Sequence, residues 1–207
     1  MKIVVLPGVG FHNDTKPYEN LSKYLMDNLN CEATPFYWKH DRPLPDVTLP
    51  YKSIRSWGYE VILDFQQVIL HAFDMVLPEA DYYIGHSAGS ILALAQKDKP
   101  CIIFGSPAIL VEAIRKEKAR ENSGSFFEAK LMESAQSKKN ILNIINKYDQ
   151  LAYYLNLPNT ENIVYQGSWF NPNTYNPLQA HLGYWDNDFT RKKIIETIKV
   201  WEKNKSK

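Results

Sequence analysis

The sequence predicts an α/β protein in which a mainly parallel sheet of about six strands lies between two layers of helices. Short apolar runs rich in β-branched residues alternate with segments of helical period along most of the 207 residues. Strands that alternate with helices are typical of a parallel sheet covered on both faces. The chain contains no repeat, linker or low-complexity segment, so we predict a single domain over residues 1–207 with a three-layer α/β/α sandwich.

The first half of the chain opens with a strand at residues 2–6, which a Pro-Gly pair ends. Residues 17–29 carry apolar side chains at helical spacing behind an initial proline, which favours a helix start. A second strand is predicted at residues 32–38. Residues 39–58 are rich in proline and lack a period, so we expect a long loop, and residues 59–77 form a strongly periodic helix.

In the second half, apolar strands and periodic helices follow one another until the last helix closes the chain. Residues 168–188, rich in Asn, Pro and aromatic residues, are predicted to be a loop. Right-handed crossovers and an early change of direction should place the first and third strands side by side. The remaining predicted strands are residues 81–84, 100–104, 140–145 and 161–166, and the remaining helical segments are 88–97, 108–139 and 189–203.

Composition excludes several classes of function. Lys and Arg number 24 against 23 Asp and Glu, a net charge of +1, which disfavours nucleic acid and anionic membranes as partners. Cys31 and Cys101 cannot form a disulfide framework, and Cys101 is expected to be a buried thiol. We find no zinc spacing, no signal peptide and no apolar run of about 18 residues. We therefore expect a cytoplasmic protein without metal, cofactor or stable membrane insertion.

The stretch around Ser87 organises the functional interpretation. Gly85, Ser87 and Gly89 form Gly-x-Ser-x-Gly between an apolar strand and a small-residue helix. A serine at such a sharp turn needs glycine two residues before and after it, because side chains there would strike the adjacent strand or helix. We therefore predict that Ser87 is an exposed nucleophile at the carboxyl end of its strand.

A serine nucleophile needs a base, and the base needs a carboxylate that fixes its tautomer. Asp149 follows the fifth predicted strand and His181 the sixth, so the order is Ser, Asp, His, each beyond a strand's carboxyl end. The alternatives are a turn or N-cap role for Asp149 and a structural hydrogen bond for His181. Asp186 and Asp188 are rival acids, although they lie close to His181 in the sequence.

The reaction also needs donors for the oxyanion. We assign the first donor to the backbone N–H of Ala88, which lies at the start of a helix whose dipole favours negative charge. We assign the second donor to the N–H of Val9, between Gly8 and Gly10, which let the backbone approach a substrate. Alternatively, this loop is a plain strand-ending turn. His12 could line the pocket or lie on the surface, whereas the turn should point His86 away from the site, where it packs.

With these residues placed, the chain resembles a small serine α/β-hydrolase of the lipase and esterase kind. The resemblance covers nearly the whole chain and is carried by Gly85 to Gly89, Asp149, His181 and the loop from Leu6 to Gly10. The chain departs from the family pattern at Pro7, where members often have histidine, and its core is reduced to about six strands. A serine at position 87 disfavours the dehalogenase-like branch.

The resemblance implies hydrolysis of a carboxylic ester through an acyl-enzyme. Aromatic residues crowd the predicted rim and suit an apolar acyl or aryl group, although they could equally pack long loops. They are Phe36, Tyr37, Trp38, Trp57, Tyr59, Trp169, Phe170, Tyr175, Tyr184 and Trp185. The substrate-binding candidates are Gly8, Gly10, His12, Trp38, Trp169 and Phe170. Residues 108–139 stand where the family inserts a cap and are either a small helical lid or a crossover helix pair. Thioester or amide cleavage and a non-catalytic binding protein are the alternative functions.

Overall fold

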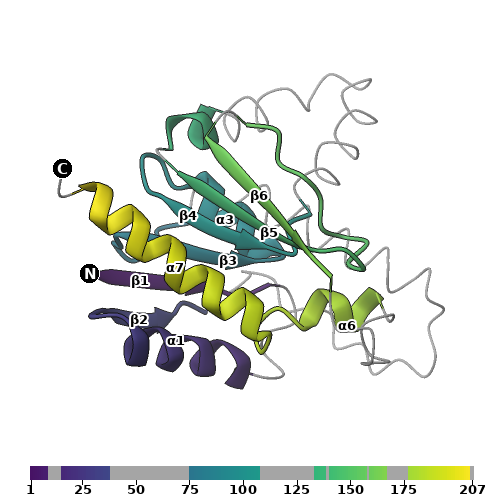
Figure 1. Cartoon of the computed structure of the whole chain (residues 1–207). Helices are drawn as coiled ribbons and strands as arrows, with labels where there is room; N and C mark the ends of the chain where they lie inside the picture. The colour runs from purple at the N-terminus through teal and green to yellow at the C-terminus, as the bar shows by residue number, and fades with distance from the viewer. Residues whose placement is uncertain are drawn as a thin grey trace.

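In the described part of the chain, a sheet of six strands, all parallel, forms the centre of the computed structural model (Figure 1). The structure describes residues 1–8, 15–37, 75–107, 133–138, 140–157, 159–166 and 177–205. The strands are β1 (Lys2–Leu6), β2 (Glu32–Pro35), β3 (Tyr82–His86), β4 (Cys101–Phe104), β5 (Ile141–Asn146) and β6 (Thr160–Tyr165). The predicted number of strands and their parallel pairing are confirmed.

The strand order is β2-β1-β3-β4-β5-β6. The chain starts inside the sheet at β1, adds β2 on one side, and then returns to place β3 on the other side of β1, with Val5 opposite Ile84. The predicted neighbours β1 and β3 are therefore confirmed. The direction of winding reverses between them, and ligands of open parallel sheets bind at such a point beyond the carboxyl ends of the strands.

Helices cover both faces of this sheet. In Figure 1, α7 (Asp188–Lys205) crosses in front of the strands, whereas α3 (Ala88–Ala95) lies behind them. α1 (Lys16–Asn28) packs beside β2 and contacts α7, and the short α6 (Pro177–Leu182) precedes α7 near the carboxyl ends of the strands. The described residues thus form three layers.

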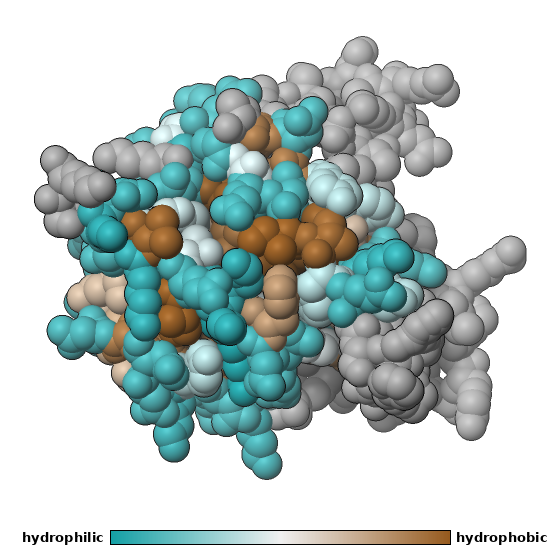
Figure 2. Space-filling view, viewed as in Figure 1, coloured by the Kyte–Doolittle hydropathy of each residue, from teal (hydrophilic) through white to brown (hydrophobic). Residues whose placement is uncertain are grey.

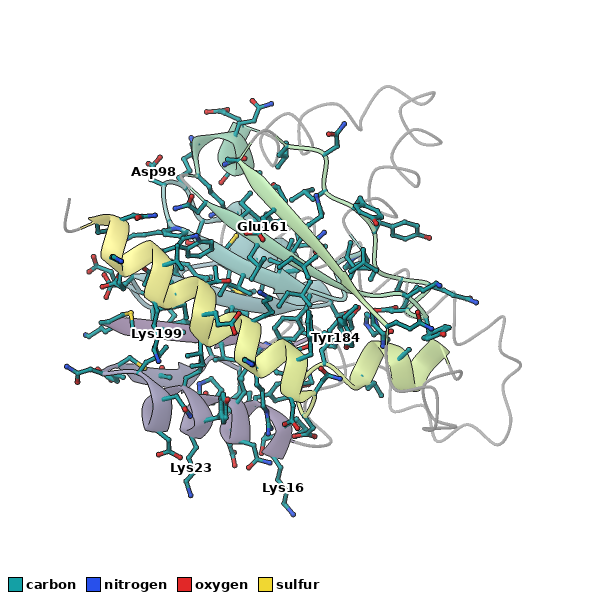
Figure 3. The ribbon with its side chains drawn as sticks, in the orientation of Figure 1. Lys16, Lys23, Asp98, Glu161, Tyr184 and Lys199 are labelled. Atoms are coloured by element: carbon teal, nitrogen blue, oxygen red, sulfur yellow. The ribbon has the colours of Figure 1, made fainter. Side chains whose placement is uncertain are left out.

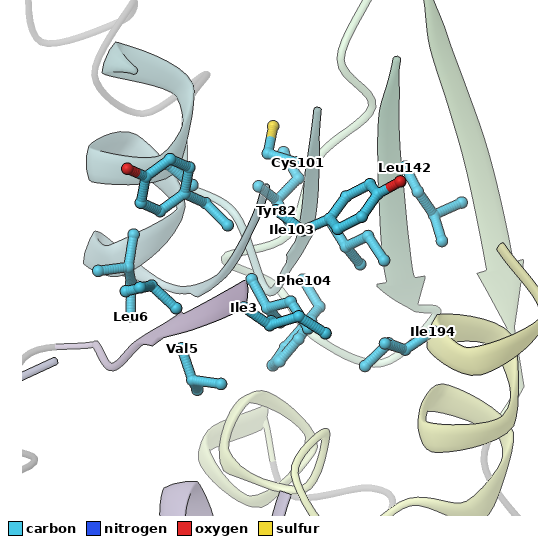
Figure 4. Packing of buried hydrophobic residues seen from close by; sticks show 14 of the residues in the cluster. Ile3, Val5, Leu6, Tyr82, Cys101, Ile103, Phe104, Leu142 and Ile194 are labelled. Atoms are coloured by element: carbon cyan, nitrogen blue, oxygen red, sulfur yellow. The ribbon is translucent and has the colours of Figure 1, made fainter. Parts of the chain in front are cut away.

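The central strands are buried on both faces, which explains their continuous apolar runs. Every residue of β3, β4 and β5 is buried. Figure 4 shows side chains from β1, β4 and α7, including Leu6, Phe104 and Ile194, packing into this core. Cys101 is a buried free thiol as expected, and burial raises the pKa of this thiol to about 11. A neutral thiol of this kind is a packing residue.

Some predicted boundaries are wrong. The second strand ends at Pro35 instead of residue 38, although the N–H of Phe36 still donates to the carbonyl oxygen of Val5 at 2.9 Å. The segment 168–188 is not all loop, because Pro177–Leu182 forms α6 and α7 begins at Asp188. The predicted helix 59–77 does not extend over its described residues 75–77, which are not helical. The rest of that helix, the predicted loop 39–58 and most of segment 108–139 lie outside the described residues.

The face shown in Figure 2 is mostly hydrophilic and is interrupted by brown hydrophobic patches. Exposed large hydrophobic residues of the described chain include Val164 on the edge strand β6 and Phe189 and Val200 on α7. None of the described helices combines the length and the apolar character needed to cross a membrane.

Candidate active site

Ser87 occupies a sharp turn between β3 and α3. Its backbone angles are φ 51° and ψ −122°, and it is one of two non-glycine residues with positive φ in the described chain. Such a conformation costs on the order of 1–3 kcal/mol and persists only where the surroundings enforce it. The predicted strand–turn–helix setting of Gly-x-Ser-x-Gly is therefore present, with backbone strain at the serine. The predicted exposure is wrong: Ser87 is 3% exposed, because the turn packs against its neighbours.

The two flanking glycines are sterically required. A Cβ on Gly85 would lie 2.4 Å from the carbonyl oxygen of Gly89, and a Cβ on Gly89 would lie 2.1 Å from the carbonyl oxygen of Leu6. Both contacts are to backbone atoms, which cannot swing aside. Glycine at these positions lets the first turn of α3 pack against the end of β1, and that contact holds Ser87 at the carboxyl end of β3.

The buried hydroxyls of Ser90 and Ser106 stabilise the turn through hydrogen bonds. Ser90 Oγ donates to the carbonyl oxygen of Ser87 at 2.6 Å. Ser90 Oγ also lies 2.8 Å from Ser106 Oγ. Because a hydroxyl has a single proton, Ser106 must donate to Ser90 in this arrangement. The chain Ser106 to Ser90 to Ser87 fixes the orientation of the strained peptide.

Asp149 and His181 form a direct, buried pair. Asp149 Oδ2 lies 2.9 Å from His181 Nδ1, and the two side chains are 0% and 7% exposed. A carboxylate can only accept a hydrogen bond, so the proton sits on Nδ1 and the Nε2 lone pair of a neutral His181 is left for a base. Asp149 Oδ1 also accepts the N–H of Leu151 at 2.9 Å. The turn role and the histidine-orienting role therefore coexist in one side chain.

Tyr184 is a partner of Asp149 that the sequence did not reveal. Its hydroxyl donates to Asp149 Oδ2 at 3.0 Å and accepts the N–H of Asn146 at 2.7 Å. It lies beside the carboxyl end of the sheet, where α6 meets α7 (Figure 3). Burial and the charge of Asp149 raise the pKa of Tyr184 well above its ordinary value, so the phenol keeps its proton and can donate. Tyr184 and Trp185, expected at the rim, are core residues.

We predict that Tyr184→Phe lowers the free energy of unfolding by about 2 kcal/mol, because it removes a hydrogen bond to a buried carboxylate and leaves the Asn146 N–H unpaired. Urea unfolding measures the effect. Tyr154→Phe is the matched control, since Tyr154 is 60% exposed; equal stability of the two variants would contradict the prediction.

The rival acids do not contact His181. Asp186 is exposed and pairs with Arg191, with 2.7 Å between Asp186 Oδ1 and Arg191 Nη2. Asp188 is exposed in the first turn of α7, where a carboxylate interacts favourably with the helix dipole. The geometry therefore favours Asp149 as the carboxylate that orients His181.

The remaining site residues are only partly described. Gly8 borders the serine: a Cβ there would lie 2.7 Å from Ser87 Cβ and 3.3 Å from Ser87 Oγ. Ala88 is the first residue of α3, so its N–H belongs to the helix donors without an intrahelical acceptor. The other predicted site residues lie outside the described residues; they are Val9, Gly10, His12, Trp38, Trp169 and Phe170.

Ser87 and His181 come from segments that meet around His86. The rings of His86 and His181 are 4.8 Å apart between centroids, and Ser87 directly follows His86. A hydrogen bond between Ser87 Oγ and His181 is not among the interactions of the described residues. In free enzymes this contact is often long and tightens when substrate binds. The described geometry therefore places the His181 ring beside the turn that holds Ser87, with Asp149 bonded to His181.

No protein-family model matches this chain, and no curated protein matches it.

Proposed function

We propose that this protein is a serine hydrolase that cleaves carboxylic esters through an acyl-enzyme intermediate, on an α/β-hydrolase fold with a reduced core. The observation that carries the proposal is the buried pair of Asp149 and His181, with 2.9 Å between Oδ2 and Nδ1. The pair lies beyond the carboxyl ends of the strands, where Ser87 occupies its strained turn. A strained serine and an oriented histidine are what nucleophilic catalysis of acyl transfer requires.

Acylation begins when His181 Nε2 takes the proton of the Ser87 hydroxyl and the serine oxygen attacks the acyl carbon. Asp149 balances the positive charge that forms on His181. The N–H of Ala88, at the start of α3, stabilises the developing oxyanion, and we expect the N–H of Val9 to do the same. Collapse breaks the ester bond, and the proton on His181 passes to the leaving alcohol.

Deacylation repeats these steps with water as the nucleophile. His181 takes a proton from water, the hydroxide attacks the acyl carbon, and the proton returns to Ser87 as the carboxylic acid leaves. Apart from the ester and water, each step uses side chains and backbone groups of this chain. We propose a small substrate with an apolar acyl or aryl group, and a cytoplasmic setting, in accord with two free cysteines.

The test uses a fluorophosphonate and a short-chain nitrophenyl ester with three proteins: wild type, Ser87→Ala and Ser137→Ala. Ser137 is the matched control, because its hydroxyl donates to the carbonyl of Ser134 and accepts the N–H of Asp98, and neither residue belongs to the site. We expect wild type and Ser137→Ala to be labelled and to turn over the ester, and Ser87→Ala to do neither. Equal ester turnover by Ser87→Ala, or a label on another residue, would overturn the proposal.

Thioesterase and amidase activity share the same groups and differ in the leaving group that His181 must protonate. Rates on ester, thioester and amide substrates with one common acyl group separate these activities. A non-catalytic binding protein would bind the acyl compounds without turnover and would leave Ser87 unlabelled.

A further inference from the structure

His86, the residue before the proposed nucleophile, is joined to the proposed base. Its side chain is buried, and Nε2 lies 2.7 Å from the backbone carbonyl oxygen of His181. A carbonyl oxygen only accepts hydrogen bonds, so Nε2 must carry the proton. A side chain on the nucleophile's own turn therefore holds the backbone of the residue that would activate the nucleophile.

The His86 ring occupies a slot that is shaped by glycines and aromatic rings. Gly105 has φ 57°, and a Cβ there would lie 3.1 Å from both Cδ2 and Nε2 of His86. A Cβ on Gly8 would lie 3.3 Å from His86 Nδ1. The ring of Trp185 meets the His86 ring edge to face, with centroids 5.1 Å apart. The ring therefore has little freedom to turn, and its hydrogen bond to His181 is held by packing.

The surroundings of Nδ1, the other ring nitrogen of His86, favour the neutral form of this side chain. Among the described residues, the buried His86 Nδ1 has no hydrogen-bond partner. A proton added there would be buried without an acceptor and would put a cation beside His181. The ionisable groups that the described part of the chain places around the ring are His181 and Tyr184, with Asp149 bonded to both. Burial, and secondly the proximity of His181, lower the pKa of His86 well below its ordinary value.

We propose that His86 is a positioning residue for the proposed hydrolysis: as the neutral Nε2–H tautomer, it fixes the peptide of His181 and thereby aims the His181 ring at Ser87. This role rests on the proposed function. A second hydrogen bond holds the adjacent peptide: Asn146 Nδ2 donates to the carbonyl oxygen of Ala180 at 3.3 Å. Because His86 stays neutral, the positive charge that forms on His181 during acylation meets no neighbouring imidazolium.

The test compares His86→Met, which fills the slot without a donor, with His86→Gln, whose side-chain amide can donate from nearly the position of Nε2. Active sites are counted with the fluorophosphonate, so that unfolded protein does not count as lost rate. We expect His86→Met to lower kcat about 10- to 100-fold with little change in KM, and His86→Gln to recover most of it. Equal kcat in the two variants, or a wild-type kcat in His86→Met, would overturn the role.

A measurement on the wild-type protein keeps the proposal testable if a variant does not fold. Nitrogen-15 NMR of the imidazole rings reports the tautomer and charge of each histidine. We expect His86 to stay neutral with its proton on Nε2 between about pH 5 and 8. A proton on Nδ1, or titration of His86 in that window, would overturn the role. Absence of any labelling or turnover in the wild type would instead overturn the proposed function, and the role with it.

Discussion

Replacing Asp149 by asparagine is expected to lower kcat for the proposed ester hydrolysis by about 10⁴-fold. The reason is that the carboxylate accepts from three donors: His181 and Tyr184 at Oδ2, and the N–H of Leu151 at Oδ1. An amide has one accepting oxygen and one donating nitrogen, so it cannot satisfy both sides of this site.

Either orientation of the asparagine amide is damaging. With its nitrogen toward His181, the amide donates to Nδ1, and the histidine proton moves to Nε2. A protonated Nε2 has no free lone pair, so the ring can no longer take a proton from Ser87. With its nitrogen toward Leu151, two donors face each other in a buried place. The first orientation changes the tautomer of the base, and the second destabilises the turn. Asp149→Asn should therefore remain folded but become nearly inactive.

Steady-state kinetics and the rate of fluorophosphonate labelling check this prediction. Asp186→Asn and Asp188→Asn are the matched controls, since both carboxylates are exposed and Asp186 pairs with Arg191. Both controls should retain wild-type activity, and thermal unfolding shows whether Asp149→Asn is folded. If Asp149→Asn kept its activity while Asp186→Asn lost it, the orienting carboxylate would be Asp186.

The parts of the site that could be predicted are those that local sequence or chain topology determines. The turn at Ser87 is local, because five consecutive residues specify its shape. Asp149 and His181 are far apart in the sequence, but the carboxyl ends of parallel strands meet at one edge of the sheet. Residues that follow neighbouring strands therefore come together, and β5 and β6 are neighbours throughout their length.

The parts that could not be predicted depend on side-chain distances across elements. Tyr184 looked like one of several rim aromatics, yet it is fully buried and bonded to Asp149. His86 was expected to point away from the site and to pack. It is buried and packed, but it points toward His181, with ring centroids 4.8 Å apart, and nothing in the sequence indicates that Nε2 reaches the carbonyl of His181. Burial of one particular aromatic residue depends on where the segment before α7 crosses the sheet, and no sequence period encodes that crossing.

Replacing Gly89 by alanine is expected to lower the free energy of unfolding by about 3 kcal/mol or more, which corresponds to a Tm lower by roughly 6–12 °C. The new Cβ would lie 2.1 Å from the carbonyl oxygen of Leu6 and 2.6 Å from that of Pro7. Both obstacles are backbone atoms at the end of β1, so the strain can be relieved only if α3 moves away from the sheet.

Movement of α3 would also alter the proposed chemistry, because Ser87 and the N–H of Ala88 lie where α3 begins. We therefore expect the folded fraction of Gly89→Ala to react slowly with the fluorophosphonate. Gly105→Ala is a control in which a smaller loss of stability is expected. Its Cβ would meet ring atoms at 3.1 Å, and its φ is 57°. The left-handed backbone should lower the free energy of unfolding by about 1–2 kcal/mol. Wild-type stability and labelling in Gly89→Ala would mean that α3 is not seated against β1, and the catalytic geometry built on that contact would then fail.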